Sequence, residues 1–109
     1  MPTPKEIFEE KLPGQLKAKG DAVTKVNAIY QFVINGANGG KWWVDATKSG
    51  GEVGSGDKDG AKCTITMNDT DFVDMVTGKL NGQMAFMTGK LKIKGDMSLA
   101  LKLGSILGM

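Results

Sequence analysis

Hydrophobic residues near the start of the chain recur at helical spacing. Over residues 4–12 the apolar side chains share one helical face and glutamates occupy the other, which predicts an amphipathic helix. Thr3 directly precedes this stretch and is expected to be its N-cap. Pro13-Gly14 is expected to interrupt or kink the helix, and a second short helix is predicted over residues 15–25.

The period then changes from helical to alternating. Residues 27–35 alternate apolar and polar positions, a glycine- and asparagine-rich turn follows, and residues 41–47 alternate again, so the pattern predicts a β-hairpin. Beyond a polar stretch with a short strand expected at Val53, residues 62–67 predict another strand. The residues predicted to share the buried face are Ala28, Tyr30, Phe32, Ile34, Trp42, Val44, Ala46, Cys63, Ile65 and Met67. The pattern therefore predicts a sheet with one solvated face.

Helical and extended segments alternate in the second half of the chain. In order, the sequence predicts a helix that Gly78 ends, a short helix that Asn81 caps and Gly89 ends, a strand over residues 91–95, and a last helix from Asp96 to about Leu107. The last helix has only one narrow polar stripe, formed by Ser98, Lys102 and Ser105. Its apolar arc is wider than one packing contact needs, which leaves burial on two sides, a ligand, a partner or a lipid surface as alternatives.

Composition excludes several kinds of chemistry. The chain has 109 residues, 40% of them hydrophobic, and a net charge of +2, which is typical of one folded domain. It contains no histidine, and all of its positive side chains are lysines, so the usual general base and the arginine phosphate clamp are missing. No apolar run is long enough to span a membrane, and the first residues lack the apolar core of a secretory signal. We therefore expect a soluble intracellular protein.

Few residues are candidates for chemistry. Cys63 is alone and lies on the buried face of its predicted strand, so a protonated structural thiol is expected rather than a nucleophile or a metal ligand. The row of Lys90, Lys92 and Lys94 either faces an anionic surface or prevents strand pairing at a sheet edge. Nucleic acid binding is not expected, because no arginine or aromatic platform is interleaved with these lysines.

Five methionines occupy apolar positions in the later predicted elements. They are Met67, Met75, Met84, Met87 and Met97. Flexible thioethers fill irregular gaps in a core and also adapt to varied apolar guests. The two interpretations left open are ordinary core packing and a deformable cavity between sheet and helices.

A long motif in the second half resembles a known family. Residues 77–97 read TGKLNGQMAFMTGKLKIKGDM, which is similar to the sterol carrier protein 2 domain. Three further segments, WWVD at 42–45, KVNA at 25–28 and CTITM at 63–67, match it too. The segments at 42–45 and 25–28 look most like the lipid-binding module of peroxisomal multifunctional enzymes. The sequence departs from the family at Gly82, where a proline is usual, and at Asp96, where asparagine is usual.

The resemblance implies a fold and a function. The implied fold is of the α+β class, with a five-stranded mixed sheet covered on one face by about five helices and an apolar lipid tunnel between the layers. The whole chain, residues 1–109, is expected to be one such domain. The implied function is non-enzymatic binding and transfer of fatty acids, fatty acyl-CoA, phospholipids or sterols, without a cofactor or metal and as a monomer. The alternative is an accessory domain that presents acyl lipid to an attached or partner peroxisomal β-oxidation enzyme.

The resemblance and the apolar positions together nominate residues for the tunnel lining. The candidates are Phe32, Ile34, Trp42, Val44, Ile65, Phe72, Val76, Gln83, Met84, Phe86, Met87, Leu99, Leu103, Ile106 and Leu107. Gln83 matches a family glutamine and is the one polar side chain expected near the tunnel. Family resemblance implies a peroxisomal location, but the chain ends Leu107-Gly108-Met109 without an S-K-L-like signal, so a cytosolic location stays open.

Overall fold

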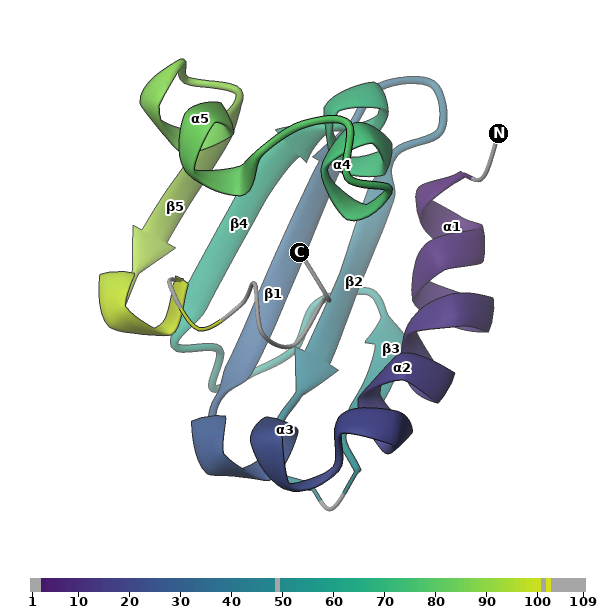
Figure 1. Cartoon of the computed structure of the whole chain (residues 1–109), viewed down its shortest axis with the longest axis vertical. Coiled ribbons are helices and arrows are strands. Elements are labelled where there is room, and N and C mark those ends of the chain that lie inside the picture. The colour runs from purple at the N-terminus through teal and green to yellow at the C-terminus, as the bar shows by residue number, and fades with distance from the viewer. Residues whose placement is uncertain (1–2, 49, 101, 103–109) are drawn as a thin grey trace.

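Five strands form one mixed sheet in the computed structural model, which describes residues 3–48, 50–100 and 102. The strands are β1 (Ile29–Asn35), β2 (Gly40–Asp45), β3 (Glu52–Ser55), β4 (Cys63–Asn68) and β5 (Leu91–Gly95). Their spatial order is β3-β2-β1-β4-β5 (Figure 1). The central strands β1 and β4 run parallel, and every other neighbouring pair is antiparallel. The predicted hairpin, the short strand at Val53 and the mixed sheet are thus confirmed.

Strand register brings the apolar positions of every strand to one side. Phe32 on β1 lies opposite Trp42 on β2 and Ile65 on β4. The alternate residues point to the other side, where Thr64 and Thr66 face solvent beside the β5 lysines. All ten residues predicted to share the buried face have exposed fractions of 5% or less. The sheet therefore has an inner, apolar face and an outer, largely polar face.

Helices cover the inner face. They are α1 (Pro4–Glu6), the π-helical segment η1 (Ile7–Lys11), α2 (Leu12–Lys19), α3 (Asp21–Val26), α4 (Asp69–Val76) and α5 (Gly82–Met87). The helices α1 and α2 follow the β3 side of the sheet, α4 and α5 lie near one end of the strands, and α3 lies near the other end (Figure 1). Together with the sheet, they confirm the predicted α+β layering.

The N-terminal helix shows how Pro13 acts. Thr3 caps it as predicted, since the Glu6 backbone N–H donates to Thr3 Oγ1 at 3.3 Å. Pro13 has no N–H to donate to the carbonyl four residues before it, and the preceding turn is a π-helix in which the Leu12 N–H donates to the Ile7 carbonyl. The expected interruption is therefore a change of helix type, because the chain continues directly into α2.

Aromatic rings join this helix to the sheet. The ring of Phe8 stacks on Trp42 and on Phe72, with centroids 4.9 Å apart in both pairs and interplanar angles of 10° and 9°. Phe32 packs against Phe8 at 5.0 Å in a tilted arrangement. The Trp42 indole N–H donates to Glu9 Oε2 at 3.3 Å, so its only polar atom is also satisfied. We call these four contacting rings, Phe8, Phe32, Trp42 and Phe72, the aromatic cluster.

The start of the last helix is also as predicted. The Ser98 backbone N–H donates to Asp96 Oδ1 at 2.9 Å, which makes Asp96 the cap. Residues 97–100 and 102 have helical backbone. The rest of the predicted helix, to about Leu107, lies outside the described residues.

Truncating the central ring of the aromatic cluster should cost much of the stability. We expect Phe8→Ala to lower the free energy of unfolding by about 3–5 kcal/mol, because Phe8 is fully buried and the stacked rings cannot close the cavity. Phe86→Ala is the matched control, since Phe86 is 42% exposed, and it should cost about 1 kcal/mol or less. Urea unfolding followed by tryptophan fluorescence measures both, and equal losses would contradict the packing described here.

Candidate functional site

The structure divides the predicted tunnel residues into three groups. Seven are buried: Phe32, Ile34, Trp42, Val44, Ile65, Phe72 and Leu99. Val76 is partly buried, and the four α5 candidates Gln83, Met84, Phe86 and Met87 are exposed. Leu103, Ile106 and Leu107 lie outside the described residues.

Part of the space predicted for the tunnel is filled by the protein's own side chains. Phe32, Trp42 and Phe72 pack ring against ring around Phe8, a residue that the sequence patterns placed on a helix face but not in the site. A core packed at this density leaves no room for an acyl chain without displacement of a ring. Space for a ligand is therefore expected on the other half of the inner face, toward β4, β5 and α5.

A buried hydrogen bond ties the last helix to this second half. The Tyr30 hydroxyl on β1 donates to the backbone carbonyl of Leu99 at 2.6 Å. Burial, with smaller contributions from the charges of Cys63 and Asp96, raises the pKa of Tyr30 well above its usual range, so the hydroxyl stays protonated and donates. This contact holds Leu99 against the sheet, and an alternating strand pattern contains no signal for it.

The short helix α5 is well capped but poorly covered. The Asn81 side chain accepts from the backbone N–H groups of Gln83 at 2.8 Å and Met84 at 3.2 Å. Ala85 is its only buried residue. Gln83, Phe86 and Met87 share one face at i, i+3 and i+4, and the exposed fractions of Phe86 and Met87 are 42% and 74%.

Two further methionines are exposed, one on α5 and one after β5. Met84 is 54% exposed on α5, and Met97, at the start of the last helix, is 45% exposed. Ordinary core packing is therefore confirmed for Met67 and Met75, which are buried, and is wrong for Met84, Met87 and Met97. We call Met84, Phe86 and Met87, which lie together on α5, the apolar surface; Met97 follows the opposite end of β5 from α5 and is not part of it.

A small pocket lies where the π-helical segment meets the end of α4. Its volume is about 100 Å³, and it is lined by Ile7, Lys11, Leu12, Gln15, Val76 and Thr77. Ile7 and Leu12 form a buried floor, and Lys11 and Gln15 are exposed at its rim. It is smaller than the roughly 300–1,000 Å³ typical of small-molecule sites, so it would hold only part of a lipid. Of its lining residues, the sequence patterns nominated Val76 alone.

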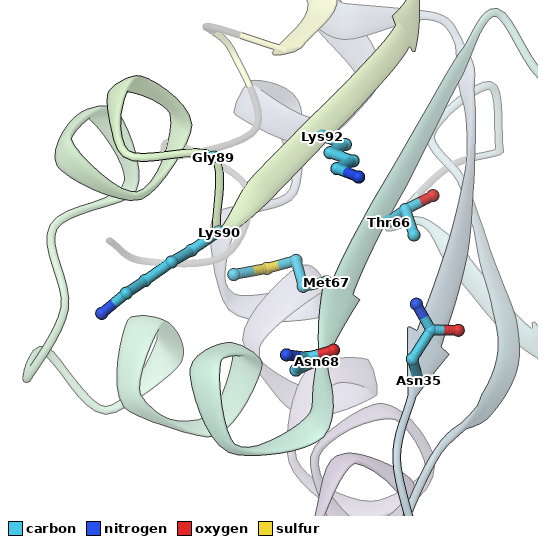
Figure 2. A pocket seen from close by; sticks show the side chains of 7 residues that line it. All are labelled: Asn35, Thr66, Met67, Asn68, Gly89, Lys90 and Lys92. Atoms are coloured by element: carbon cyan, nitrogen blue, oxygen red, sulfur yellow. The ribbon is translucent and has the colours of Figure 1, made fainter.

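A second pocket lies at the ends of β1 and β4, beside the start of β5. It has a volume of about 170 Å³ and is lined by Asn35, Thr66, Met67, Asn68, Gly89, Lys90 and Lys92 (Figure 2). Apart from Met67 and Gly89, these side chains are polar. Lys92 and Lys94 lie on the outer face of β5, which is an edge strand. Contact with an anionic surface and prevention of strand pairing at the sheet edge are therefore both consistent with the position of these two lysines.

Cys63 has the environment of a structural thiol. It is 1% exposed, and burial, with a smaller contribution from Asp96, raises the pKa of its thiol. A raised pKa leaves little of the nucleophilic thiolate at neutral pH. Among the described residues, no three histidine, cysteine, aspartate or glutamate side chains gather in a metal-binding group. In the same part of the chain, no helix has the length and hydropathy needed to cross a membrane.

Comparison with known proteins supplies the family context. Residues 8–108 match the model of the SCP-2 sterol transfer family. Hydroxysteroid dehydrogenase-like protein 2 of Xenopus tropicalis is 51% identical over 89 residues, which are 81% of this chain and 21% of that protein. Peroxisomal multifunctional enzyme A of Dictyostelium discoideum is 46% identical over 100 residues, which are 88% of this chain and 22% of that protein. The chain thus spans about a fifth of the length of these curated relatives.

A solved structure supports the same comparison. The solution structure of sterol carrier protein-2 from Aedes aegypti, in complex with the C16 fatty acid palmitate, has a TM-score of 0.74 and 25% identity. It covers 94% of this chain, and this chain covers 91% of it. The five-stranded sheet with its helical layer is therefore a fold known from a palmitate complex.

Removing the Tyr30 hydroxyl should loosen the last helix. We expect Tyr30→Phe to cost about 1–2 kcal/mol of stability, because the Leu99 carbonyl loses a buried donor while the ring stays in place. Hydrogen exchange should become faster over residues 96–100 and stay unchanged at β2. Unchanged exchange over residues 96–100 would contradict the role given to this bond.

Stability should also fall in alkaline solution. Above the ordinary pKa of a thiol, about 8.5, the unfolded chain loses the Cys63 proton while the folded chain keeps it, so unfolding becomes more favourable. The loss is at most about 1.4 kcal/mol for each unit by which folding raises that pKa. Urea midpoints of the wild type and of Cys63→Ala, measured from neutral pH to about pH 9.5, test this, and parallel profiles would show that the thiol contributes nothing.

Proposed function

The chain belongs to the SCP-2 sterol transfer family, and on this premise we propose that it binds a long-chain lipid between the helices and the inner face of the sheet, as a carrier without catalytic activity of its own. The apolar surface is the observation that carries the proposal. Three large apolar side chains, Met84, Phe86 and Met87, lie exposed on α5, beside a sheet face that is otherwise buried. A folded domain rarely leaves such a patch uncovered unless something binds there.

An acyl chain has the right chemistry to cover these side chains. Each buried methylene contributes roughly 0.8 kcal/mol, so a chain of about 16 carbons has on the order of 12 kcal/mol of gross burial. The costs of association and ordering reduce this to affinities from roughly micromolar to nanomolar without a strong polar anchor. Such a site selects for chain length more than for headgroup. Fatty acids, fatty acyl-CoA, phospholipids and sterols are accordingly the proposed ligand classes.

The placement of the nominated residues refines the proposal. The aromatic cluster is already packed, so Phe32, Trp42 and Phe72 form a wall that the ligand abuts. Ile65, Leu99 and the α5 side chains lie on the other half, where the lipid would lie. Gln83 shares the exposed face of α5 with Phe86 and Met87, so in this proposal its amide would lie among the side chains that the lipid covers.

A second role is favoured by the curated relatives. Their names describe a dehydrogenase-like protein and a peroxisomal multifunctional enzyme, and the matched region is about a fifth of each. An accessory domain that presents acyl lipid to an attached or partner β-oxidation enzyme is consistent with both, and so is a peroxisomal location. Residues 1–109 would then act as one lipid-binding unit. Contact with an anionic membrane through Lys90, Lys92 and Lys94 completes the proposal.

Truncation on α5 should weaken lipid binding without unfolding the chain. We expect Phe86→Ala to lower the affinity for a fluorescent long-chain fatty acid by about 1–2 kcal/mol, or fivefold to thirtyfold, because the bound chain loses part of the apolar area that it buries. Trp43→Ala is the matched control, since it removes an aromatic ring from the outer face of β2. Native mass spectrometry of the purified protein should also detect co-purified lipid.

Two results would contradict the proposal at different levels. Absence of saturable binding by the wild type at roughly 10 μM protein would exclude the carrier function. Equal affinity of the wild type and Phe86→Ala, with saturable binding retained, would leave the function and exclude α5 from the site.

A further inference from the structure

The pocket of about 170 Å³ described above, here called the outer pocket, is formed where two parallel strands end. Asn35 and Asn68 are the last residues of β1 and β4 and lie opposite each other in the strand register. Thr66, two residues earlier on β4, pairs with Lys92 on β5. Strands are spaced by about 4.8 Å, so β1 and β5 stand roughly 10 Å apart with Thr66 between them. Figure 2 shows Lys92 and Thr66 on the same side of the sheet, away from α4 and α5.

The side chains around this pocket are donors at the surface, exposed at Asn35, Asn68 and Lys92 and half-buried at Thr66, that bond to no other described residue. Besides Lys90, which extends away from it, the pocket is lined by two amides, one hydroxyl and one ammonium, from Asn35, Asn68, Thr66 and Lys92. Across residues 3–48, 50–100 and 102, none of these four side chains makes a hydrogen bond or an ion pair. Asparagine, threonine and lysine donors that converge on one small space match the oxygens of a phosphate group.

Among the residues that the structure describes, no carboxylate lines the pocket. The nearest acid in the sequence, Asp69, is already committed, because its Oδ2 accepts from the Asn38 N–H at 3.0 Å and its Oδ1 accepts from the Thr70 N–H at 2.8 Å. The positive charge of Lys92 is therefore not neutralised from within the site. An anion would supply the missing charge and the missing acceptors together.

Protection of a sheet edge does not account for this arrangement. A lysine on the edge strand β5 discourages pairing with another strand, but Asn35 lies on β1, the middle strand of the sheet. Edge protection also requires no hydroxyl or amide beside the lysine. Edge protection therefore fits the lysines of β5 but leaves the amides and the hydroxyl of the pocket without an explanation.

The neighbouring helix indicates where the anion comes from. The α5 helix ends at Met87, and the chain passes through Gly89 and Lys90 of the pocket directly into β5. Lys90 extends from the pocket toward α4 and α5 (Figure 2). Exposed Met84, Phe86 and Met87 thus lie within a few residues of a cationic site. Until an acyl chain covers them, apolar side chains next to a phosphate-sized cationic pocket match a bilayer surface, whereas a free phosphate has no apolar part.

We propose that the outer pocket binds the phosphate of an anionic phospholipid headgroup and so docks this end of the domain on a bilayer, with α5 toward the membrane. The inference rests on the proposed carrier function, since a carrier has to meet the membrane that supplies its lipid. It adds a second lipid-binding position, on the opposite face of the sheet from the acyl chain.

Vesicle flotation tests the pocket with charge-matched variants. The vesicles are phosphatidylcholine alone and an equimolar mixture of phosphatidylcholine and phosphatidic acid. We expect the wild type to float with the mixed vesicles, Lys92→Gln to bind about fivefold more weakly, and Thr66→Val, which changes no charge, to bind up to about tenfold more weakly. Lys25→Gln on α3, at the opposite end of the strands, carries the same charge change and should bind like the wild type.

Each alternative outcome is distinguishable. If Lys92→Gln and Lys25→Gln weaken vesicle binding equally and Thr66→Val has no effect, the overall charge of the protein attracts it to the vesicles, and the pocket is not the binding site. Binding of inorganic phosphate at residues 35, 66 and 68, without flotation of the protein, would show that the pocket takes free phosphate and would overturn the bilayer as the source of the anion. Absence of flotation with wild-type palmitate binding intact would overturn this inference alone, and loss of palmitate binding as well would count against the carrier function.

Discussion

One-sided burial of the sheet is the constraint on which the rest of the structure depends. Because the strand register brings Phe32, Trp42 and Ile65 to the same face, a single layer has to cover every apolar side chain of five strands. The N-terminal helix covers the β2 half with stacked rings. The β5 half receives only one buried side chain from α5, that of Ala85. The unequal cover of the two halves is what makes a lipid-binding role physically reasonable.

Local patterns predicted most of the fold because their causes are local. Alternation identified the inner face of β1, β2 and β4, and the caps at Thr3, Asn81 and Asp96 were predicted from residue types that satisfy free backbone N–H groups. Helical periodicity is weaker evidence, because it shows which residues share a face but not whether anything covers that face. Met75 and Met87 have similar sequence surroundings, yet one is buried and the other is 74% exposed.

The candidate sites were less predictable because they are assembled from distant segments. The motif in the second half identified the family, and the three comparisons agree with it, but the motif does not show that Phe8 fills the space beside Trp42. The outer pocket combines residues from three strands, and no spacing in the sequence places Asn35 near Lys92. Lysine alternation on β5 was visible, and its two amide neighbours were not.

The hydrogen bond between the Tyr30 hydroxyl and the Leu99 carbonyl joins residues 69 positions apart. The parallel pairing of β1 likewise needs β4, which comes later in the chain. A growing chain leaves the ribosome from its N-terminus, so the hairpin of β1 and β2 is complete while one edge of β1 still has no neighbour. Unpaired edges are where nascent chains pair with the wrong strand. Domains dominated by such distant pairings fold slowly. Correct assembly therefore depends on shielding the open edge of β1 during synthesis, when the domain is most exposed to aggregation.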